Sequence, residues 1–172
     1  MIQTNVYGPK NMSEALIPMI DPEVGRIVNV GSGGGGMHVS KRDESDQKLL
    51  AHDSANTTWP QLEEYIKNFL ANGDKNSGMG AYGMSKAVLH VYTQIQAKEN
   101  PKLKINAISP GFVDTAMTAG YGAKLTPEEG TVAIRHCLFK DLEGNGWYYG
   151  SDAVRSPLHF MRNPGEPAFA GY

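Results

Sequence analysis

An α/β fold built on a parallel sheet is the fold class that the sequence predicts, and three short runs carry this prediction. RIVNV at 26–30 and KINAIS at 104–109 are typical of fully buried parallel strands, and WYYG at 147–150 is a candidate third, short strand. Helical patterns precede the first run and separate all three. This alternation predicts parallel strands joined by right-handed crossovers, within one domain of 172 residues.

The chain up to Leu70 holds two predicted helices with the first strand and a polar stretch between them. SEALIPMI at 13–20 is an apolar helical stretch that could extend back through Val6, and Pro18 is expected to kink or end it. Residues 38–58 are polar and fit a surface excursion. The helix that follows, from Pro60 to Leu70, has Thr58 as its N-cap. Its apolar residues share one face: Leu62, Tyr65, Ile66 and Phe69.

The remaining elements follow a glycine-rich turn, GMGAYG. A long helix is expected from Tyr82 to about Glu99, where Pro101 stops it. A helix from Pro127 to about Phe139 is expected after the second strand, with Thr126 as N-cap and acidic residues in its first turn. The tail at 156–172 is rich in proline and glycine and is expected to wrap the surface.

Composition excludes several classes of function. The chain is 40% hydrophobic and 20% charged with a formal net charge of −2, which gives no electrostatic reason to expect nucleic acid or an anionic membrane as partner. No apolar run is long enough for a membrane span, and the first residues do not form a signal peptide. The single cysteine, Cys137, excludes an internal disulfide and is expected to be a buried small hydrophobe. These features suit a cytoplasmic location.

The stretch VNVGSGGGG at 28–36 has three possible interpretations. Gly31, Gly33 and Gly36 satisfy G-x-G-x-x-G, but a dinucleotide cradle also needs a helix directly after the glycines and an acid at the end of a second strand. The following residues, MHVSKRDESDQK, are too polar for a helix packed on a sheet, and Asp53 follows a poor strand. A flexible turn without chemistry is the second possibility. The third is that Ser32 is the important residue.

Tyr82 and Lys86 form a pair that could act together with Ser32 on a substrate oxygen. At i and i+4 on a helix, the two side chains share a face about one turn apart. A phenol is a reluctant acid at neutral pH, and a nearby cation lowers its pKa by stabilising the phenolate. Such a pair can exchange a proton with a substrate oxygen, and a serine hydroxyl placed opposite can hold that oxygen. The combination suits reduction of a carbonyl group, with hydride supplied by a cofactor.

Four segments, taken in order, carry a resemblance to a known family. They are IQTN at 2–5, GRIVNVGS at 25–32, AYGMSK at 81–86 and INAISPGFVDTAM at 105–117. With them the chain resembles the short-chain dehydrogenases/reductases, and most closely the monomeric NADPH-dependent carbonyl reductases and their plant relatives. Ser32 and Tyr82 lie fifty positions apart, and this gap resembles the insertion of the carbonyl reductases, here at 37–79.

The resemblance assigns roles residue by residue. It implies that Tyr82 is the acid on the substrate oxygen, that Lys86 supports it and binds the nicotinamide ribose, and that Ser32 orients the carbonyl. It makes Asn5 the residue that holds a water in the proton relay. The segment that lines the nicotinamide would comprise Pro110, Gly111, Val113 and Thr115. Phe112 is expected to pack beneath this loop, and Met117 and Tyr121 could line the substrate pocket.

The resemblance also implies a partial fold. The family's T-G-x-x-x-G-x-G turn and its N-N-A-G motif should precede Asn5, and neither occurs in this sequence. The chain therefore resembles the C-terminal portion of such an enzyme: the last three strands and their helices of a Rossmann-like, doubly wound parallel sheet, without the N-terminal dinucleotide-binding half. NADP(H) is the implied cofactor, although we expect this chain alone to bind it poorly.

Two functions remain open at this point. The first is NAD(P)H-dependent reduction of a small ketone, aldehyde or quinone. The second is a non-catalytic role as an interaction protein, because the strand at 26–31 would be an open sheet edge able to pair with another chain. Full-length relatives are expected to be monomers, whereas this chain is expected to self-associate. Neither reading involves a metal: the histidines are scattered without ligand spacing, at positions 38, 52, 90, 136 and 159.

Overall fold

A computed structural model describes residues 1–72 and 80–171. Its centre is a parallel sheet in the order β1-β2-β3, formed by Arg26–Val30, Lys104–Ile108 and Tyr148–Tyr149. β1 and β2 pair over their full length, with Arg26 opposite Lys104 and Val30 opposite Ile108. The predicted α/β class with parallel strands is confirmed.

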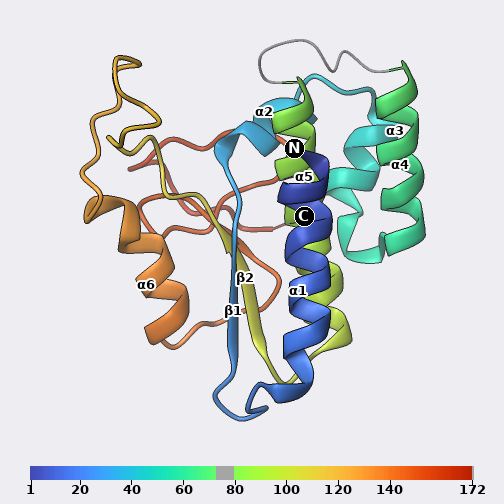
Figure 1. The fold of residues 1–172 in the computed structure, drawn as a ribbon, viewed down its shortest axis with the longest axis horizontal. Coiled ribbons are helices and arrows are strands. Elements are labelled where there is room, and N and C mark those ends of the chain that lie inside the picture. Colours follow the sequence, from blue (N-terminus) through green and yellow to red (C-terminus); the bar gives the residue numbers. More distant parts are fainter. Residues whose placement is uncertain (73–79, 172) are drawn as a thin grey trace.

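Helices cover both faces of the sheet (Figure 1). One face carries α6 (Val132–Phe139), and the other carries α5 (Gly80–Glu99) with α1 (Gly8–Leu16) beside it. The other described α-helices are α2 (Gly33–Val39), α3 (Glu44–Gln47) and α4 (Trp59–Asn72). Short π or 3-10 turns flank or connect them at Gln3–Tyr7, Ile17–Met19, Lys48–His52, Ser54–Asn56 and Glu129–Thr131. None of the described helices is long and apolar enough to cross a membrane.

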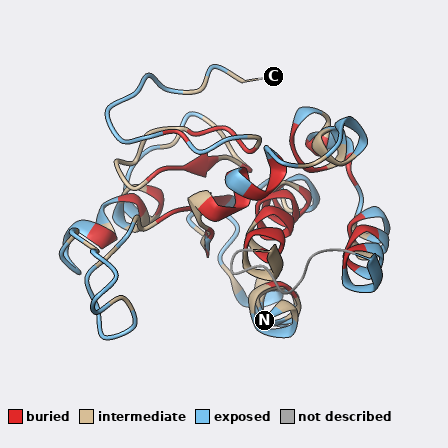
Figure 2. Ribbon diagram, turned by 90° about the horizontal axis from the view of Figure 1, so that it is seen from above, coloured by how far each residue is buried: buried red, intermediate tan, exposed pale blue. Residues whose placement is uncertain are grey.

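Helix α5 is the centre of the core. It is buried along most of its length, as the red segment in the middle of Figure 2 shows. The buried Asn29 of β1 donates hydrogen bonds to Thr93 Oγ1 at 2.9 Å and to Gln96 Oε1 at 3.0 Å on α5. These bonds satisfy polar groups that would otherwise be costly to bury, and they fix α5 on β1, the strand that precedes Gly31.

Most predicted elements occur where the sequence places them. The apolar face of α4 is buried as expected, and the N–H of Thr58 donates to Gln61 Oε1 at 2.8 Å, which is half of a capping box. Thr126 and Glu129 form a full capping box at 2.7 and 3.2 Å. That box opens a 3-10 turn, and the α-helix itself begins later than expected, at Val132.

Two expectations about the segment after β1 are wrong. A helix does form at the glycines, because α2 packs against α5 rather than against the sheet and so does not need a broad apolar face. The segment at 38–58 is not merely a surface excursion, since Val39, Leu50 and Ala51 are at most 1% exposed and join the core cluster that includes α4 and α5. Residues 73–79 of the predicted insertion, with Gly78 and Met79 of the glycine-rich turn, lie outside the described residues.

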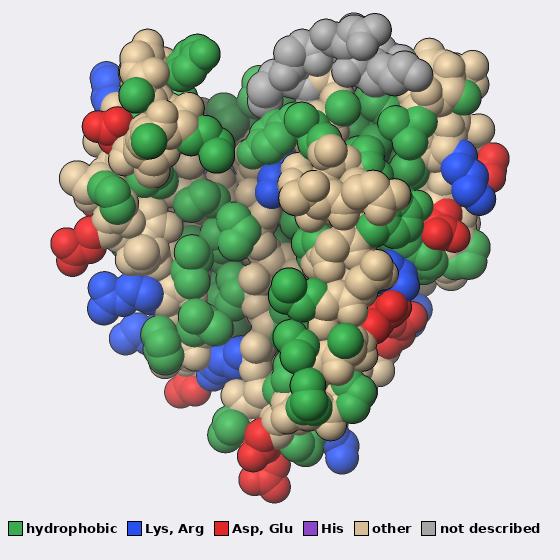
Figure 3. Space-filling view, viewed as in Figure 1, with side chains coloured by type: hydrophobic (Ala, Val, Ile, Leu, Met, Phe, Trp, Pro, Cys, Tyr) green, Lys and Arg blue, Asp and Glu red, His purple; other side chains and the backbone are tan. Residues whose placement is uncertain are grey.

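β1 is an edge strand, as expected. Among the described strands it pairs only with β2, and Val30 is 47% exposed. Figure 3 shows hydrophobic side chains gathered on the face that carries β1 and α1. Exposed apolar residues on the helices to either side of β1 include Met12 and Leu16 of α1 and Val132 and Phe139 of α6. An unpaired edge beside apolar surface is a surface prone to association.

Candidate functional site

A cavity of about 720 Å³ lies at the carboxyl ends of the strands, which is where ligands bind in open α/β sheets. Four segments form its walls: the turn after β1, the start of α5, the loop after β2, and the chain that follows β3. The lining includes Ser32, Gly33, Met37, Tyr82, Ser109, Gly111, Phe112, Leu125, Tyr148, Ser151, Ser156, Met161 and Arg162. Ser32 and Tyr82 therefore face the same cavity.

Ser32 is the N-cap of α2. Its Oγ accepts a hydrogen bond from the N–H of Gly34 at 3.1 Å, so the hydroxyl proton remains able to donate to another oxygen. The backbone N–H of Ser32 donates to Nε2 of His90 at 3.3 Å. Because this imidazole holds the peptide group and not the hydroxyl, the pair lacks the geometry of a histidine-activated serine nucleophile.

The glycines around Ser32 make room for neighbouring groups. A Cβ at Gly31 would lie 2.2 Å from Nε2 of His90, and one at Gly35 would lie 2.8 Å from Cε1 of the same ring. A Cβ at Gly36 would lie 2.5 Å from the carbonyl oxygen of Phe160. The run thus permits close packing of α2 against α5 and against the C-terminal segment. This packing accounts for the glycines without a phosphate ligand.

His90 lies directly behind the cavity wall. It is 2% exposed, and its ring stacks on that of Tyr148 at a centroid distance of 4.1 Å. Burial lowers the pKa of His90 to about 3 and raises the pKa of Tyr148 to about 12, so both are neutral at pH 7. The sequence indicated no role for His90; the two glycines that leave space for its ring are the signal that could have suggested one.

Tyr82 and Lys86 lie on the first turns of α5. The Lys86 ammonium is 5.8 Å from the centroid of the Tyr82 ring, and it donates a hydrogen bond to the carbonyl oxygen of Val30 at 2.8 Å. Burial lowers the pKa of Lys86. The Lys86 ammonium thus lies near the Tyr82 ring and is held at the end of β1.

Asn5 does not line the cavity but is linked to Tyr82 through the backbone. Its Nδ2 donates to Ser85 Oγ at 3.1 Å, and Ser85 Oγ donates to the carbonyl oxygen of Tyr82 at 2.7 Å. This chain of hydrogen bonds joins the N-terminal helical turn to the start of α5. Asn5 is therefore placed to hold the backbone that carries the phenol.

Of the four residues of the loop after β2 that were expected to line the nicotinamide site, one lines the cavity. Gly111, with φ of +81°, lines the cavity, whereas Pro110, Val113 and Thr115 are not among its lining residues. Val113 instead forms a bridge to Leu125, and the N–H of Thr115 donates to Thr118 Oγ1 at 2.9 Å.

Three aromatic or apolar residues near this loop are also placed differently from the expectation. The expectation that Phe112 packs beneath the loop is wrong, because its side chain is 50% exposed and lines the cavity. Met117 and Tyr121 are 88% and 78% exposed and lie outside the lining.

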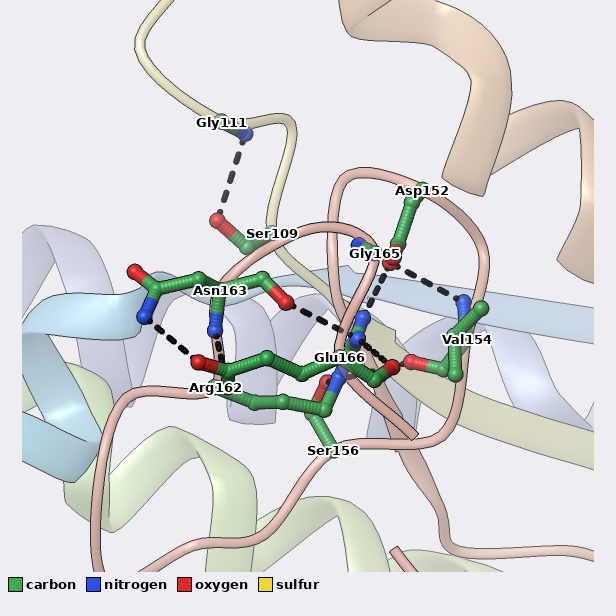
Figure 4. A network of polar contacts seen from close by, with 9 residues as sticks. All are labelled: Ser109, Gly111, Asp152, Val154, Ser156, Arg162, Asn163, Gly165 and Glu166. Carbon is green, nitrogen blue, oxygen red and sulfur yellow. Dashed lines mark hydrogen bonds and ion pairs between the residues drawn. The ribbon is translucent and has the colours of Figure 1, made fainter. Parts of the chain in front are cut away.

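The C-terminal segment is the largest contribution that sequence reasoning missed. It does not simply wrap the surface: Leu158 and Arg162 are buried, and Met161 and Arg162 form a wall of the cavity. Figure 4 shows that Arg162 is the centre of a network of polar contacts. The only sequence feature that could have indicated this wall is the single arginine at 156–172, and one residue forms no periodic pattern.

The cavity has few ionisable groups. Lys124 and Arg162 are the charged residues among the described lining residues, and none of these is a carboxylate. Within residues 1–72 and 80–171, no cluster of three histidine, cysteine or acidic side chains is arranged to hold a metal ion. The arrangement can therefore offer hydrogen-bond donors to a substrate oxygen, from a serine and a tyrosine, beside a lysine.

Fold and site together define a class of protein: an α/β fold on a parallel sheet, with a serine and a tyrosine lining a cavity at the carboxyl ends of the strands and a lysine nearby. Comparisons with known proteins agree. The chain is 37% identical to (+)-neomenthol dehydrogenase of Arabidopsis thaliana over 83% of its length, and 30% identical to carbonyl reductase [NADPH] 1 of Homo sapiens, also over 83%. The structure of salutaridine reductase from Papaver somniferum, 32% identical, superposes with a TM-score of 0.73 over 86% of this chain.

These similarities show that the chain belongs to the short-chain dehydrogenase/reductase family. It covers 50% of the plant dehydrogenase, 55% of the human reductase and 53% of the salutaridine reductase structure, so it spans about half the length of the relatives that it matches. No family model matches the chain.

Proposed function

We propose that this chain carries the proton-transfer half of a carbonyl reductase, which reduces a small ketone, aldehyde or quinone with NAD(P)H. One observation carries the proposal: the hydroxyl-bearing residues Ser32 and Tyr82 line one cavity, and the Lys86 ammonium lies 5.8 Å from the Tyr82 ring. The names of the relatives, which are reductases and dehydrogenases, support the same chemistry.

The proposed roles follow from the hydrogen-bonding state of each group. Ser32 Oγ already accepts from Gly34, so its proton is free to donate to the carbonyl oxygen and polarise the C=O bond. Tyr82 donates its phenolic proton to that oxygen as the carbonyl carbon gains hydride. Lys86 stabilises the phenolate that remains until it regains a proton from solvent. Asn5 acts through Ser85 on the position of Tyr82.

The residues present fit one end of a nicotinamide dinucleotide. The ammonium of Lys86, beside the cavity, and Gly111, in its wall, suit the nicotinamide and its ribose. The spaces beside Gly31, Gly35 and Gly36 are filled by His90 and Phe160, which argues against a phosphate cradle in that run. The cofactor would supply hydride. NADPH is the form we propose, by resemblance to the carbonyl reductases.

A second candidate function rests on a different observation. β1 is an open edge among the described strands, so the chain could act by pairing with another polypeptide and without catalysis. Measurement of reductase activity separates the two candidate functions. A chain that acts only by pairing with another polypeptide would bind its partner whether or not the Tyr82 hydroxyl is present. The proposed location is the cytoplasm, which rests on the composition and the single cysteine alone.

The test is reduction of menadione or an aldehyde by the purified chain, monitored by the loss of NADPH absorbance. It is run at a high concentration of NADPH, because we expect the chain to bind the cofactor weakly. Tyr82→Phe is expected to lower the rate by about a hundredfold or more, because the general acid is removed. Ser32→Ala and Lys86→Met are expected to lower it as well. Tyr121→Phe is the matched control, because Tyr121 is 78% exposed and outside the cavity lining. Activity that survives Tyr82→Phe would refute the proposal.

A further inference from the structure

The segment that follows β3 is built around a buried arginine. Arg162 is 8% exposed although it belongs to a stretch of irregular structure, and it lines the same cavity as Ser32. An arginine is rarely buried unless its donors are paired. The reason for its burial is visible in Figure 4, where its guanidinium group points into the folded segment at 152–166.

The guanidinium group uses each of its three nitrogens. Nε donates to Ser156 Oγ at 3.0 Å, Nη1 donates to the carbonyl oxygens of Asn163 and Glu166 at 3.0 and 2.7 Å, and Nη2 forms an ion pair with Asp152. One side chain thus ties together four points of the segment. Hydrogen bonds of a charged donor are stronger than neutral ones, so this is a firm attachment.

Asp152 extends the attachment. Its Oδ2 accepts from the N–H of Gly165 at 3.1 Å, and its Oδ1 accepts from the N–H of Val154 at 3.3 Å. Burial alone would raise the pKa of Asp152, but the hydrogen bonds from Gly165 and Arg162 outweigh it and hold the pKa below its ordinary value. The carboxylate is therefore ionised at neutral pH and remains paired with Arg162.

The sequence leaves room for this arrangement next to β3. A Cβ at Gly150 would lie 2.9 Å from Nη2 of Arg162 and 3.0 Å from Ser156 Oγ. The N–H of Ser156 donates to the carbonyl oxygen of Tyr148 at 2.8 Å, which attaches the segment to the strand itself. The sheet, the arginine and the segment consequently form one continuous unit.

Met161 is the side chain of this unit that lies against the turn carrying Ser32. A Cβ at Gly33 would lie 2.9 Å from Met161 Sδ, so the thioether lies directly against the residue that follows Ser32. Met161 is 47% exposed and is a cavity-lining residue. A flexible apolar side chain in this place limits the size of a group that can lie beside the Ser32 hydroxyl.

We propose that Arg162 is a positioning residue that holds the 152–166 segment as a wall of the cavity, and that Met161 on this wall determines the size of the carbonyl substrate. The inference rests on the proposed function for its kinetic consequence. The wall itself is a structural statement, and it can be tested whether or not the chain is active. The expected substrates are carbonyl compounds with an apolar body, because Met37, Phe112 and Leu125 complete the lining.

Amide hydrogen exchange tests whether Arg162 holds the 152–166 segment, and this measurement does not require the chain to be catalytically active. In Arg162→Met, the amides of Gly165 and Glu166 are expected to exchange about tenfold faster than in the wild type, because their acceptors belong to the network, while amides of α5 keep their protection. Asp152→Asn is expected to give a weaker change in the same residues. Arg135→Met, at an exposed position on α6, is the matched control. Unchanged exchange in Arg162→Met would overturn the positioning role.

Ligand binding tests the size limit. Dissociation constants for cyclohexanone and for the bulkier 2-decalone are measured by NMR titration of the chain. Met161→Ala is expected to improve the binding of 2-decalone relative to cyclohexanone by about tenfold, while exchange in the segment stays as in the wild type. An unchanged ratio would overturn the role of Met161, whatever the activity of the chain.

If the wild type reduces both ketones, kinetics give a further readout. Arg162→Met is then expected to raise KM by about tenfold while kcat changes little, because the wall binds substrate and the proton donors lie elsewhere. A fall in kcat with KM unchanged would overturn the assignment. Absence of activity in the wild type would count against the proposed function alone. The hydrogen-exchange and ligand-binding measurements would still test the roles of Arg162 and Met161.

Discussion

Gly31→Ala is the substitution whose effect follows most directly from the structure. The added methyl group would lie 2.2 Å from Nε2 and 2.7 Å from Cδ2 of His90, and 3.1 Å from the carbonyl oxygen of Ile108. The imidazole has little room to retreat, because it is 2% exposed and stacks on Tyr148 at 4.1 Å. The methyl group must therefore displace the ring or the turn that carries Ser32.

The expected cost combines two effects. Overpacking of a buried site costs about 1–3 kcal/mol, and loss of the hydrogen bond from Ser32 to His90 costs about 1 kcal/mol more. The free energy of unfolding should fall by about 2–4 kcal/mol, which for a chain of this size lowers Tm by about 4–16 °C. Thermal melting followed by circular dichroism measures the change. Gly8→Ala is the control, because its added methyl meets nothing closer than 3.3 Å.

A double-mutant cycle decides whether His90 is the cause. His90→Ala alone is expected to destabilise, since it opens a cavity and leaves the N–H of Ser32 without its acceptor. In that background Gly31→Ala should cost at least about 1 kcal/mol less than in the wild type, because the new methyl occupies the vacated space. Equal costs in the two backgrounds, or a melting temperature of Gly31→Ala close to that of the wild type, would refute the packing explanation of the glycines.

Three further predictions concern pH, cofactor and assembly. Burial lowers the pKa of His90 to about 3 and that of His38 to about 4, from an ordinary value near 6.5. The stability that the neutral imidazoles support is therefore full above pH 6.5 and is lost as the pH falls toward 3. His90→Gln should reduce the slope of unfolding free energy against pH in acid, and an unchanged slope would contradict this. Calorimetric titration with NADPH should show only weak binding, and a micromolar Kd would be the opposite result. Light scattering should show concentration-dependent self-association that Val30→Lys reduces, whereas a monomer at every concentration would exclude association through β1.

The strands and the long helices could be predicted because their residues obey simple periodicities. The β-branched run at Arg26–Val30 has no competing helical pattern, and the apolar face of α4 repeats at helical spacing. The short helix α2 could not be predicted from the polarity of residues 37–48. Its stability comes from glycine-mediated contact with α5, which depends on residues about fifty positions away.

The candidate site was predictable where it rests on local motifs. Ser32, Tyr82 and Gly111 line one cavity, and each follows a strand or begins a helix that the sequence indicates. The C-terminal wall was not predictable, because the contacts of Arg162 with Asp152 and Ser156 join residues in irregular structure, where no periodic signal exists. The exposure of Phe112 was missed for a related reason, since a loop residue next to Gly111 has no pattern that indicates its direction.

The central claim is that two hydroxyl groups share one substrate oxygen, and a crystal structure of the chain with cyclohexanone tests it most directly. We predict that the ketone oxygen lies within hydrogen-bond distance of both Ser32 Oγ and the Tyr82 hydroxyl, with the ring of the ketone toward Met161. A ketone bound elsewhere, or a ketone oxygen that contacts neither hydroxyl, would contradict the claim.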